Sequence, residues 1–390
     1  MELIKQYGTP LKITYLPKIS QQINRAKRMF NVAMAKVDYK GSYNYCYHRQ
    51  PLLVRAGEAM KNDIHLETSS AYDIHIINAL YDSGIIDKDR HHLQRFQAAA
   101  VCGEHRPAGQ RSFVNIPVLD NKEGWSCSRI RSPRNAGRHP HRREENQVRF
   151  YTSRLGIRYN DIINYKAKLK NNKSSAQDAA LLPQYRHQDG LLLERVVEVH
   201  QRLLRAEGHL PRIGQPQHRR RIPIRTRSTS VRLQYLTEEI IAQIKNICHR
   251  NDTEEPNIFT EFGSFTVGES GAALYSIVNQ KQQNDRENWY MIDSSFITTL
   301  PDTWGINQRY IMLAVNNWDR EYQRVLLGGL TCDSEDFYNA ESHTNAIFLP
   351  KLEPGNTQYI GFFHTGAYQE SLGGFGGIQH CLIPAPKHII

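Results

Sequence analysis

Residues 11–37 read LKITYLPKISQQINRAKRMFNVAMAKV, and this stretch decides the fold. The run from Leu11 to Leu16 predicts a strand, and apolar residues then recur at nearly helical spacing as far as Val37. The same order returns downstream, where 63–70 predicts a strand and 71–81 predicts a helix. Alternating strands and helices predict parallel strands joined by right-handed crossovers, and a β/α barrel is one such arrangement.

The pattern changes near residue 265. Before that point, 236–249 has the apolar face of a helix and 256–262 predicts one more strand. Beyond it, aromatic and β-branched runs alternate with Gly, Pro, Asn and Asp, which predicts strands at 288–296, 309–315, 323–330, 346–349 and 358–364. The predicted fold class is therefore α/β plus all-β, with a β/α domain at 1–265 and a β domain at 266–390.

Composition narrows the class of protein. The chain of 390 residues has no apolar run of eighteen, and its first nine residues have no apolar signal core, so we expect a cytoplasmic protein without a membrane span. The histidine pairs lack helical ligand spacing, and the cysteines lie far apart in the sequence. We therefore expect reduced thiols and no metal site. The six cysteines are Cys46, Cys102, Cys127, Cys248, Cys332 and Cys381.

The positive charge is confined to two stretches. Residues 91–147 and 174–232 have net charges of +5 and +6, which together account for the whole chain's +11. Of their 21 basic residues, 20 are Arg, whereas the rest of the chain uses Lys freely. Clustered basic residues favour nucleic-acid binding. However, these arginines lie among Pro and Gly without the period of a helix face, so we expect no nucleic-acid partner and leave a disordered surface as the simple alternative.

One motif carries a family resemblance. Residues 328–336 read GGLTCDSED, which resembles a signature of pyridoxal-phosphate (PLP) dependent decarboxylases with the alanine-racemase-like barrel. Further segments, in the same order, resemble arginine decarboxylases of the biosynthetic type. They are YGTP at 7–10, the strand 39–47, LETSS at 66–70, SRLG at 153–156, TEFG at 260–263 and HTGAY at 364–368. The resemblance implies a (β/α)8-type PLP-binding barrel followed by a C-terminal β domain.

The resemblance also implies roles for four residues. Cys332 would reach the neighbouring subunit's site as a catalytic acid, and Asp333 would bind the cationic end of the substrate. Glu261 would face the pyridine nitrogen of the cofactor, and Tyr368 would donate its hydroxyl to the cofactor phosphate. The structural alternatives are a buried thiol, a turn residue, a strand-end carboxylate and a core aromatic, respectively. The role of Arg154 stays open.

Two expected cofactor contacts are missing. In the family a lysine on the second barrel strand bonds to the cofactor, but here His48-Arg49-Gln50-Pro51 follows Tyr47. The family's phosphate-binding glycine triplet is replaced by Arg219-Arg220-Arg221. The codons CAT CGG CGG CGG ATT CCC encode His-Arg-Arg-Arg-Ile-Pro, and read one base later they give Ile-Gly-Gly-Gly-Phe. We therefore predict that 48–58, 91–110, 124–143 and 174–234 are frame-shifted, and that the barrel is incomplete or disrupted in 91–147 and 174–234.

These observations define the expected function. It is PLP-dependent decarboxylation of a basic amino acid, with arginine converted to agmatine for polyamine biosynthesis as the first choice. Because the family builds its site from two chains, we expect a homodimer or a higher homo-oligomer. An inactive relative without the cofactor lysine is the main alternative, and a basic nucleic-acid-binding protein is the other.

Overall fold

The computed structural model describes most of the two ends of the chain and short pieces of its middle. The described residues are 1–48, 53–68, 72–86, 92–95, 115–118, 141–142, 157–158, 179–181, 216–218, 233–250, 252, 254–285, 287–306, 308–338, 347–373 and 381–390. Arg154 and most of the stretches 91–110, 124–143 and 174–234 lie outside this set, and so does Arg219-Arg220-Arg221.

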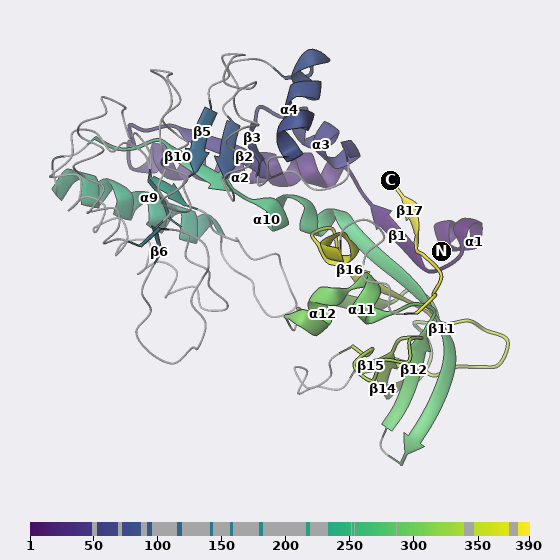
Figure 1. Ribbon diagram of the computed structural model, residues 1–390. Coiled ribbons are helices and arrows are strands. Elements are labelled where there is room, and N and C mark those ends of the chain that lie inside the picture. The colour runs from purple at the N-terminus through teal and green to yellow at the C-terminus, as the bar shows by residue number, and fades with distance from the viewer. Residues whose placement is uncertain are drawn as a thin grey trace.

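A nine-stranded sheet has the strand pairing of an open barrel (Figure 1). Its order is β5-β4-β3-β2-β10-β9-β8-β6-β7, and its strand pairs are parallel. The first strand of the series, β2, therefore pairs with the last, β10, as barrel closure requires. The strands are β2 (Tyr43–His48), β3 (His65–Thr68), β4 (His92–Arg95), β5 (Asn115–Val118), β6 (His141–Arg142), β7 (Ile157–Arg158), β8 (Ala179–Leu181), β9 (Pro216–His218) and β10 (Ile258–Glu261). Among the described residues no pairing joins β5 to β7, so the sheet is an incomplete barrel.

Amphipathic helices cover this sheet. They are α2 (Pro17–Lys36), α3 (Leu53–Met60), α4 (Tyr72–Asp82) and α9 (Leu233–Arg250). Helix α2 begins with proline, which has no N–H to leave unpaired in the first turn. Its apolar positions Ile19, Ile23 and Phe30 are buried in one core with Ile241 and Ile244 of α9. The helices expected from the periodicity of 19–37 and 236–249 are thus confirmed.

Part of the stretch 48–58 is ordered. Residues 53–58 belong to α3, where Arg55 and Ala56 are 4% and 7% exposed. Helix α3 packs against α2, and Ser20 of α2 donates a hydrogen bond of 2.5 Å to the carboxylate of Glu58. This part of a stretch that is predicted to be frame-shifted therefore forms a helix in contact with α2.

An eight-stranded mixed sheet forms the second half of the structure. Its path is β13-β16-β11-β12-β14-β15, and β1 and β17 extend it beside β11. The strands are β1 (Leu11–Thr14), β11 (Gly271–Asn284), β12 (Glu287–Ile292), β13 (Ile311–Ala314), β14 (Tyr322–Gly328), β15 (Ile347–Pro350), β16 (Tyr359–Phe363) and β17 (Lys387–Ile389). A separate core of aromatic and aliphatic side chains, including Tyr275, Tyr290, Phe296 and Phe362, fills this half. The β region expected after residue 265 is present, although the boundary of the two domains at 265 stays a prediction.

Strand β1 does not lie in the barrel. The strand predicted at 11–16 exists, but Leu11 pairs with Leu274 of β11 in antiparallel orientation and with Lys387 of β17 in parallel orientation. The apolar side of β1 explains its place, because Leu11 packs with Ile4 of α1 (Glu2–Tyr7) and with Leu274. The short segment 15–16 then carries the chain from the β half into α2, and the barrel begins at β2.

No helix in the described part of the chain is long and apolar enough to cross a bilayer.

Candidate active site

The family motif forms a closed loop at the end of β14. In this segment, 329–336, which we call the Cys332 loop, the N–H of Gly329 donates to the carbonyl of Asp336 at 2.7 Å. Inside the loop, the N–H of Asp336 donates to the carbonyl of Asp333 at 3.1 Å. The two ends of the loop are therefore pinned together, and the residues between them are presented as a turn.

Asp336 anchors the Cys332 loop to the β half. Its carboxylate is buried, and one oxygen accepts the N–H of Phe296 at 2.8 Å where α11 (Phe296–Thr299) begins. The other oxygen accepts the N–H of Thr331 at 3.1 Å and its hydroxyl at 2.5 Å. A side chain on Gly329 would overlap this carboxylate, which explains glycine there. Sequence reasoning missed Asp336, whose only signal was its place as the second aspartate of the motif.

The two predicted residues of the loop differ in exposure. The thiol of Cys332 is exposed, and its sulfur lies 3.6 Å from that of Cys381. This contact is the main reason that the pKa of Cys332 is raised above that of an ordinary thiol. Asp333 is half-buried, and its carboxylate accepts the N–H of Glu335 at 2.8 Å. It therefore stabilises the turn, which is the structural alternative given for it. Cys332 is not the buried thiol of the structural alternative.

Glu261 ends β10 at the carboxyl edge of the barrel sheet. Its backbone is in register with Cys46 of β2, and helix α10 (Gly263–Val267) begins two residues later. Helix α10 is fixed to the barrel near its last residue by a buried contact, in which the hydroxyls of Tyr45 and Thr266 are 2.6 Å apart. Because active sites of β/α barrels lie at the carboxyl ends of the strands, Glu261 is in a suitable place for a catalytic or cofactor-binding residue.

The segment with Tyr368 meets the other end of α10. The N–H groups of Thr365 and Gly366 donate to the carbonyls of Gly271 and Gly268, each at 3.0 Å. A Cβ on Gly366 would overlap the carbonyl oxygen of Val267, so only glycine permits this approach. Tyr368 follows at a φ of 61°, half-buried against the barrel core. Helix α10 thus connects the strand end of Glu261 with the segment of Tyr368.

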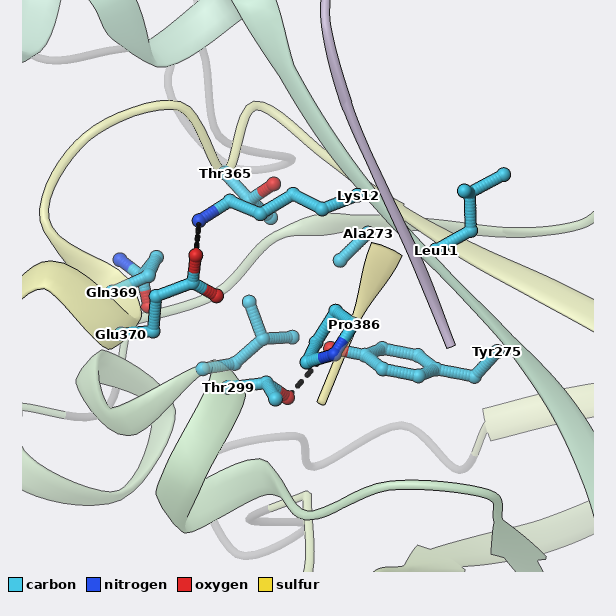
Figure 2. Close-up of a pocket in the computed structure, with 10 residues that line it drawn as sticks. Leu11, Lys12, Ala273, Tyr275, Thr299, Thr365, Gln369, Glu370 and Pro386 are labelled. Atoms are coloured by element: carbon cyan, nitrogen blue, oxygen red, sulfur yellow. Dashed lines mark hydrogen bonds and ion pairs between the residues drawn. The ribbon is translucent and has the colours of Figure 1, made fainter. Parts of the chain in front are cut away.

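A buried group of charges supports this segment. Lys12 on β1 is 5% exposed and makes an ion pair of 2.5 Å with Glu370, as Figure 2 shows. From α3, the guanidinium of Arg55 donates to the carbonyl of Gly366 and, at 3.0 Å, to the hydroxyl of Thr14. Burial lowers the pKa of Lys12 and of Arg55. Sequence reasoning missed this group, because the residues that form it are far apart in the chain.

Lys12 and Glu370 line a narrow cavity between β1, β11 and η2 (Gln369–Gly373) (Figure 2). The hydroxyl of Thr365 and the side-chain oxygen of Gln369 are buried there, and the described residues give these two atoms no hydrogen-bond partner. An ordered water molecule is the usual partner of such atoms. The cavity is a seam between strands and shows no room for a cofactor ring.

The residues present satisfy only some of the contacts that PLP requires. Glu261 and Tyr368 offer suitable chemistry from positions joined through α10. However, the last residue of β2, where the covalent contact is expected, is His48, and no described residue of β2, β3 or β10 is a lysine. Strand β9 pairs with β10 and ends at His218, so the expected glycine triplet is replaced by arginines directly after it. The lysine contact is therefore not satisfied, and we assign no chemical step to the cofactor.

The predicted site residues fall into two groups on two sheets. Cys332 and Asp333 follow β14 of the eight-stranded sheet, whereas Glu261 ends β10 of the barrel sheet and Tyr368 packs on the barrel core. Among the described residues, no group of three or more His, Cys, Asp and Glu side chains could hold a metal ion.

Comparison of sequences supports the resemblance to biosynthetic arginine decarboxylases. No family model matches the chain. An arginine decarboxylase of Glycine max is 39% identical over 97 residues, which are 23% of this chain and 14% of that protein. A biosynthetic arginine decarboxylase of Pasteurella multocida is 32% identical over 122 residues, 30% of this chain and 19% of that protein. The matched stretches thus span less than a fifth of these curated relatives.

Comparison of structures establishes the fold over nearly the whole chain. The biosynthetic arginine decarboxylase of Campylobacter jejuni superimposes with a TM-score of 0.81 at 17% identity, covering 99% of this chain and 80% of that one. A Paramecium bursaria Chlorella virus arginine decarboxylase bound to agmatine gives 0.74 at 12% identity, covering 100% and 98%. A lysine/ornithine decarboxylase of Vibrio vulnificus complexed with cadaverine gives 0.72 at 15% identity, covering 100% and 96%. The chain therefore has the barrel-plus-β fold of these decarboxylases.

Proposed function

We propose that the protein belongs to the decarboxylases that release carbon dioxide from a basic amino acid with PLP, and that arginine is its substrate and agmatine its product. The observation that supports this most directly is the Cys332 loop, in which the buried carboxylate of Asp336 holds a turn that carries the exposed Cys332 and the half-buried Asp333. Arginine decarboxylases among the sequence relatives and the solved structures support the choice of arginine.

The Cys332 loop supplies groups for both ends of this substrate. A carboxylate binds a guanidinium through two parallel hydrogen bonds, so Asp333 would hold the arginine side chain. Loss of carbon dioxide leaves the α-carbon in need of a proton, and a thiol can donate one, so Cys332 would be the acid. Both residues belong to one loop fixed by Asp336, and therefore the distance between these two groups is set before substrate binds.

The barrel would supply the cofactor contacts. If Glu261 and Tyr368 hold PLP at this edge of the barrel, the cofactor would supply an electron-accepting ring for the decarboxylation. Glu261 would keep a proton on the pyridine nitrogen, because a neighbouring carboxylate favours the charged form of a base. Tyr368 would donate its hydroxyl to the phosphate. By the same proposal the protein is a homodimer or higher homo-oligomer in the cytoplasm and acts in polyamine biosynthesis. Its two domains would be 1–265 and 266–390, with β1 of the first joined to the sheet of the second.

An inactive relative is the second candidate, and one observation favours it. The residue at the end of β2 is His48, whose imidazole cannot form the covalent bond that a lysine amine forms with the cofactor aldehyde. An intact reading frame across codons 48–58 and 174–234 of the gene would favour the inactive relative. If single-base errors lie there, the true protein has both the lysine and the glycine loop.

The test has two steps. The gene is first resequenced across those codons. The encoded full chain is then incubated with PLP, reduced with borohydride, and measured by mass for retained cofactor and by agmatine formation from arginine. Retained cofactor and agmatine support the decarboxylase, provided that Cys332→Ala lowers the rate and the exposed neighbour change Ser334→Ala does not. A folded chain that retains no cofactor and forms no agmatine overturns the proposal in favour of the inactive relative.

A further inference from the structure

Two cysteines from separate parts of the chain meet at the surface of the β half. Cys332 lies in the Cys332 loop and Cys381 lies shortly before β17, and their sulfurs are 3.6 Å apart. Cys332 is exposed and Cys381 is partly exposed, whereas Cys46 and Cys248 are at most 1% exposed. A disulfide bond is about 2.05 Å long, so the pair is a dithiol whose sulfurs need to approach by about 1.5 Å.

The two segments differ in how firmly they are held. The Cys332 loop is fixed through Asp336, as described above. The segment of Cys381 is held at Lys387, whose N–H donates to the carbonyl of Pro10 at 3.1 Å. In the segment between Cys381 and Lys387, Pro384 and Pro386 have no N–H to donate, and Leu382 is fully exposed. Cys381 can therefore move toward Cys332 without breaking a strand pairing of β17.

We propose that Cys332 and Cys381 are a reversible dithiol–disulfide pair whose reaction partner is a small-molecule disulfide. The thiolate of Cys332 attacks the disulfide, forms a mixed disulfide and releases one thiolate of the reagent. The thiolate of Cys381 then attacks the sulfur of Cys332 and releases the second. In total the protein loses two electrons and two protons and gains one sulfur–sulfur bond, and the reagent is reduced to two thiols.

This pair would regulate the activity proposed above, and only this consequence depends on that function. A sulfur bonded to Cys381 has no proton to give to the α-carbon of a substrate. Oxidation would therefore stop decarboxylation, and a reducing thiol would restore it. Formation of the disulfide depends only on the two cysteines, so this part of the inference holds whether or not the protein turns over arginine.

Oxidised glutathione is a suitable probe on the full chain, followed by alkylation and trypsin digestion. Trypsin would release Cys332 in peptide 325–351 and Cys381 in peptide 352–387, since no Lys or Arg lies inside either one. We expect the two peptides to be joined, with the mass of two hydrogens lost, and to separate after reduction. A mixed disulfide on Cys332 without the link, a link between two chains, or no reaction would overturn the inference.

Variants separate the thiol chemistry from other effects. Cys381→Ser should abolish the link and leave glutathione attached to Cys332, and Cys381→Ala gives the same reading if the serine variant does not fold by circular dichroism. The neighbour variant Leu382→Ala should keep the link. If the link forms but arginine is never turned over, the proposed function fails while this inference stands. If arginine is turned over and no link forms, this inference alone fails.

Discussion

The carboxylate of Asp336 accepts the backbone N–H of Phe296 at 2.8 Å, which joins the Cys332 loop to the start of α11 forty positions earlier in the chain. This contact ties the loop to the core of the β half. Five predictions rest on it and on the other contacts of the site.

Asp336→Asn should loosen the Cys332 loop. An amide keeps one oxygen for Phe296 but turns an N–H group toward Thr331, whose own N–H then has no acceptor. Loss of a buried hydrogen-bond acceptor costs about 1–3 kcal/mol of unfolding free energy. Urea unfolding followed by tryptophan fluorescence measures this. The matched control is Glu335→Gln, since Glu335 is exposed, and equal stability of the two variants would contradict the role given to Asp336.

Glu370→Gln should destabilise the fold strongly, because it leaves the ammonium of Lys12 buried without its counter-charge. Breaking a buried ion pair from one side costs about 3–5 kcal/mol. We expect the lower end of this range, because the side chain of Glu370 is 30% exposed. The control is Glu321→Gln, which breaks an exposed pair with Lys351 and should cost less than about 1 kcal/mol. Thermal unfolding of both variants at neutral pH compares them.

The Glu370→Gln effect should depend on pH. Burial lowers the pKa of Lys12, so the folded protein releases this proton at a lower pH than the unfolded chain, whose lysine titrates near about 10.4. Stability rises with pH where the unfolded state binds more protons. The loss of unfolding free energy that the charged Lys12 causes is thus present below the pKa of Lys12 in the folded protein. It fades as the pH rises toward the pKa of Lys12 in the unfolded chain. Without Glu370 that pKa falls further, so the deficit of the variant should shrink between neutral pH and about pH 10. A constant deficit would argue against Lys12 as its source.

Gly366→Ala should separate the Tyr368 segment from α10, because the added methyl group overlaps the carbonyl oxygen of Val267. Overpacking of this kind costs about 1–3 kcal/mol. Gly57→Ala is the control, since a Cβ there meets no atom within 4 Å and helix α3 should gain stability from alanine. Chemical denaturation of the two variants should therefore shift in opposite directions.

Cys381→Ala should make Cys332 more reactive at neutral pH. The contact with Cys381 raises the pKa of Cys332, so its removal brings that pKa back toward an ordinary thiol and increases the thiolate fraction. The groups near this thiol are Cys381 and the carboxylate of Asp333, and the variant removes only the first. The rate of iodoacetamide labelling of peptide 325–351 across a pH series measures the shift. A profile that stays in place, or that Leu382→Ala moves equally, would refute the assignment.

Local patterns were enough to predict much of the fold. Helices α2 and α9 were predictable because an amphipathic face repeats along each of them, and the Cys332 loop was recognisable because its motif is contiguous. The anchors of the site were not predictable in this way. Lys12 and Glu370 are 358 positions apart, and Asp336 binds a backbone group that carries no sequence signal. Packing also decided which strands β1 pairs with, since the sequence of β1 has the pattern of a barrel strand but β1 pairs with β11.

The placement of β1 has a consequence for how the chain is made. Residues 11–14 leave the ribosome before their strand partners, which are residues 271–274 and 387–389. During synthesis the first strand therefore has no sheet to join until β11 is translated, and its second edge stays open until β17 is added. Domains tend to fold in the order of synthesis. The barrel would therefore assemble before β1 has paired with β11 and β17, although it lies between these strands in the sequence.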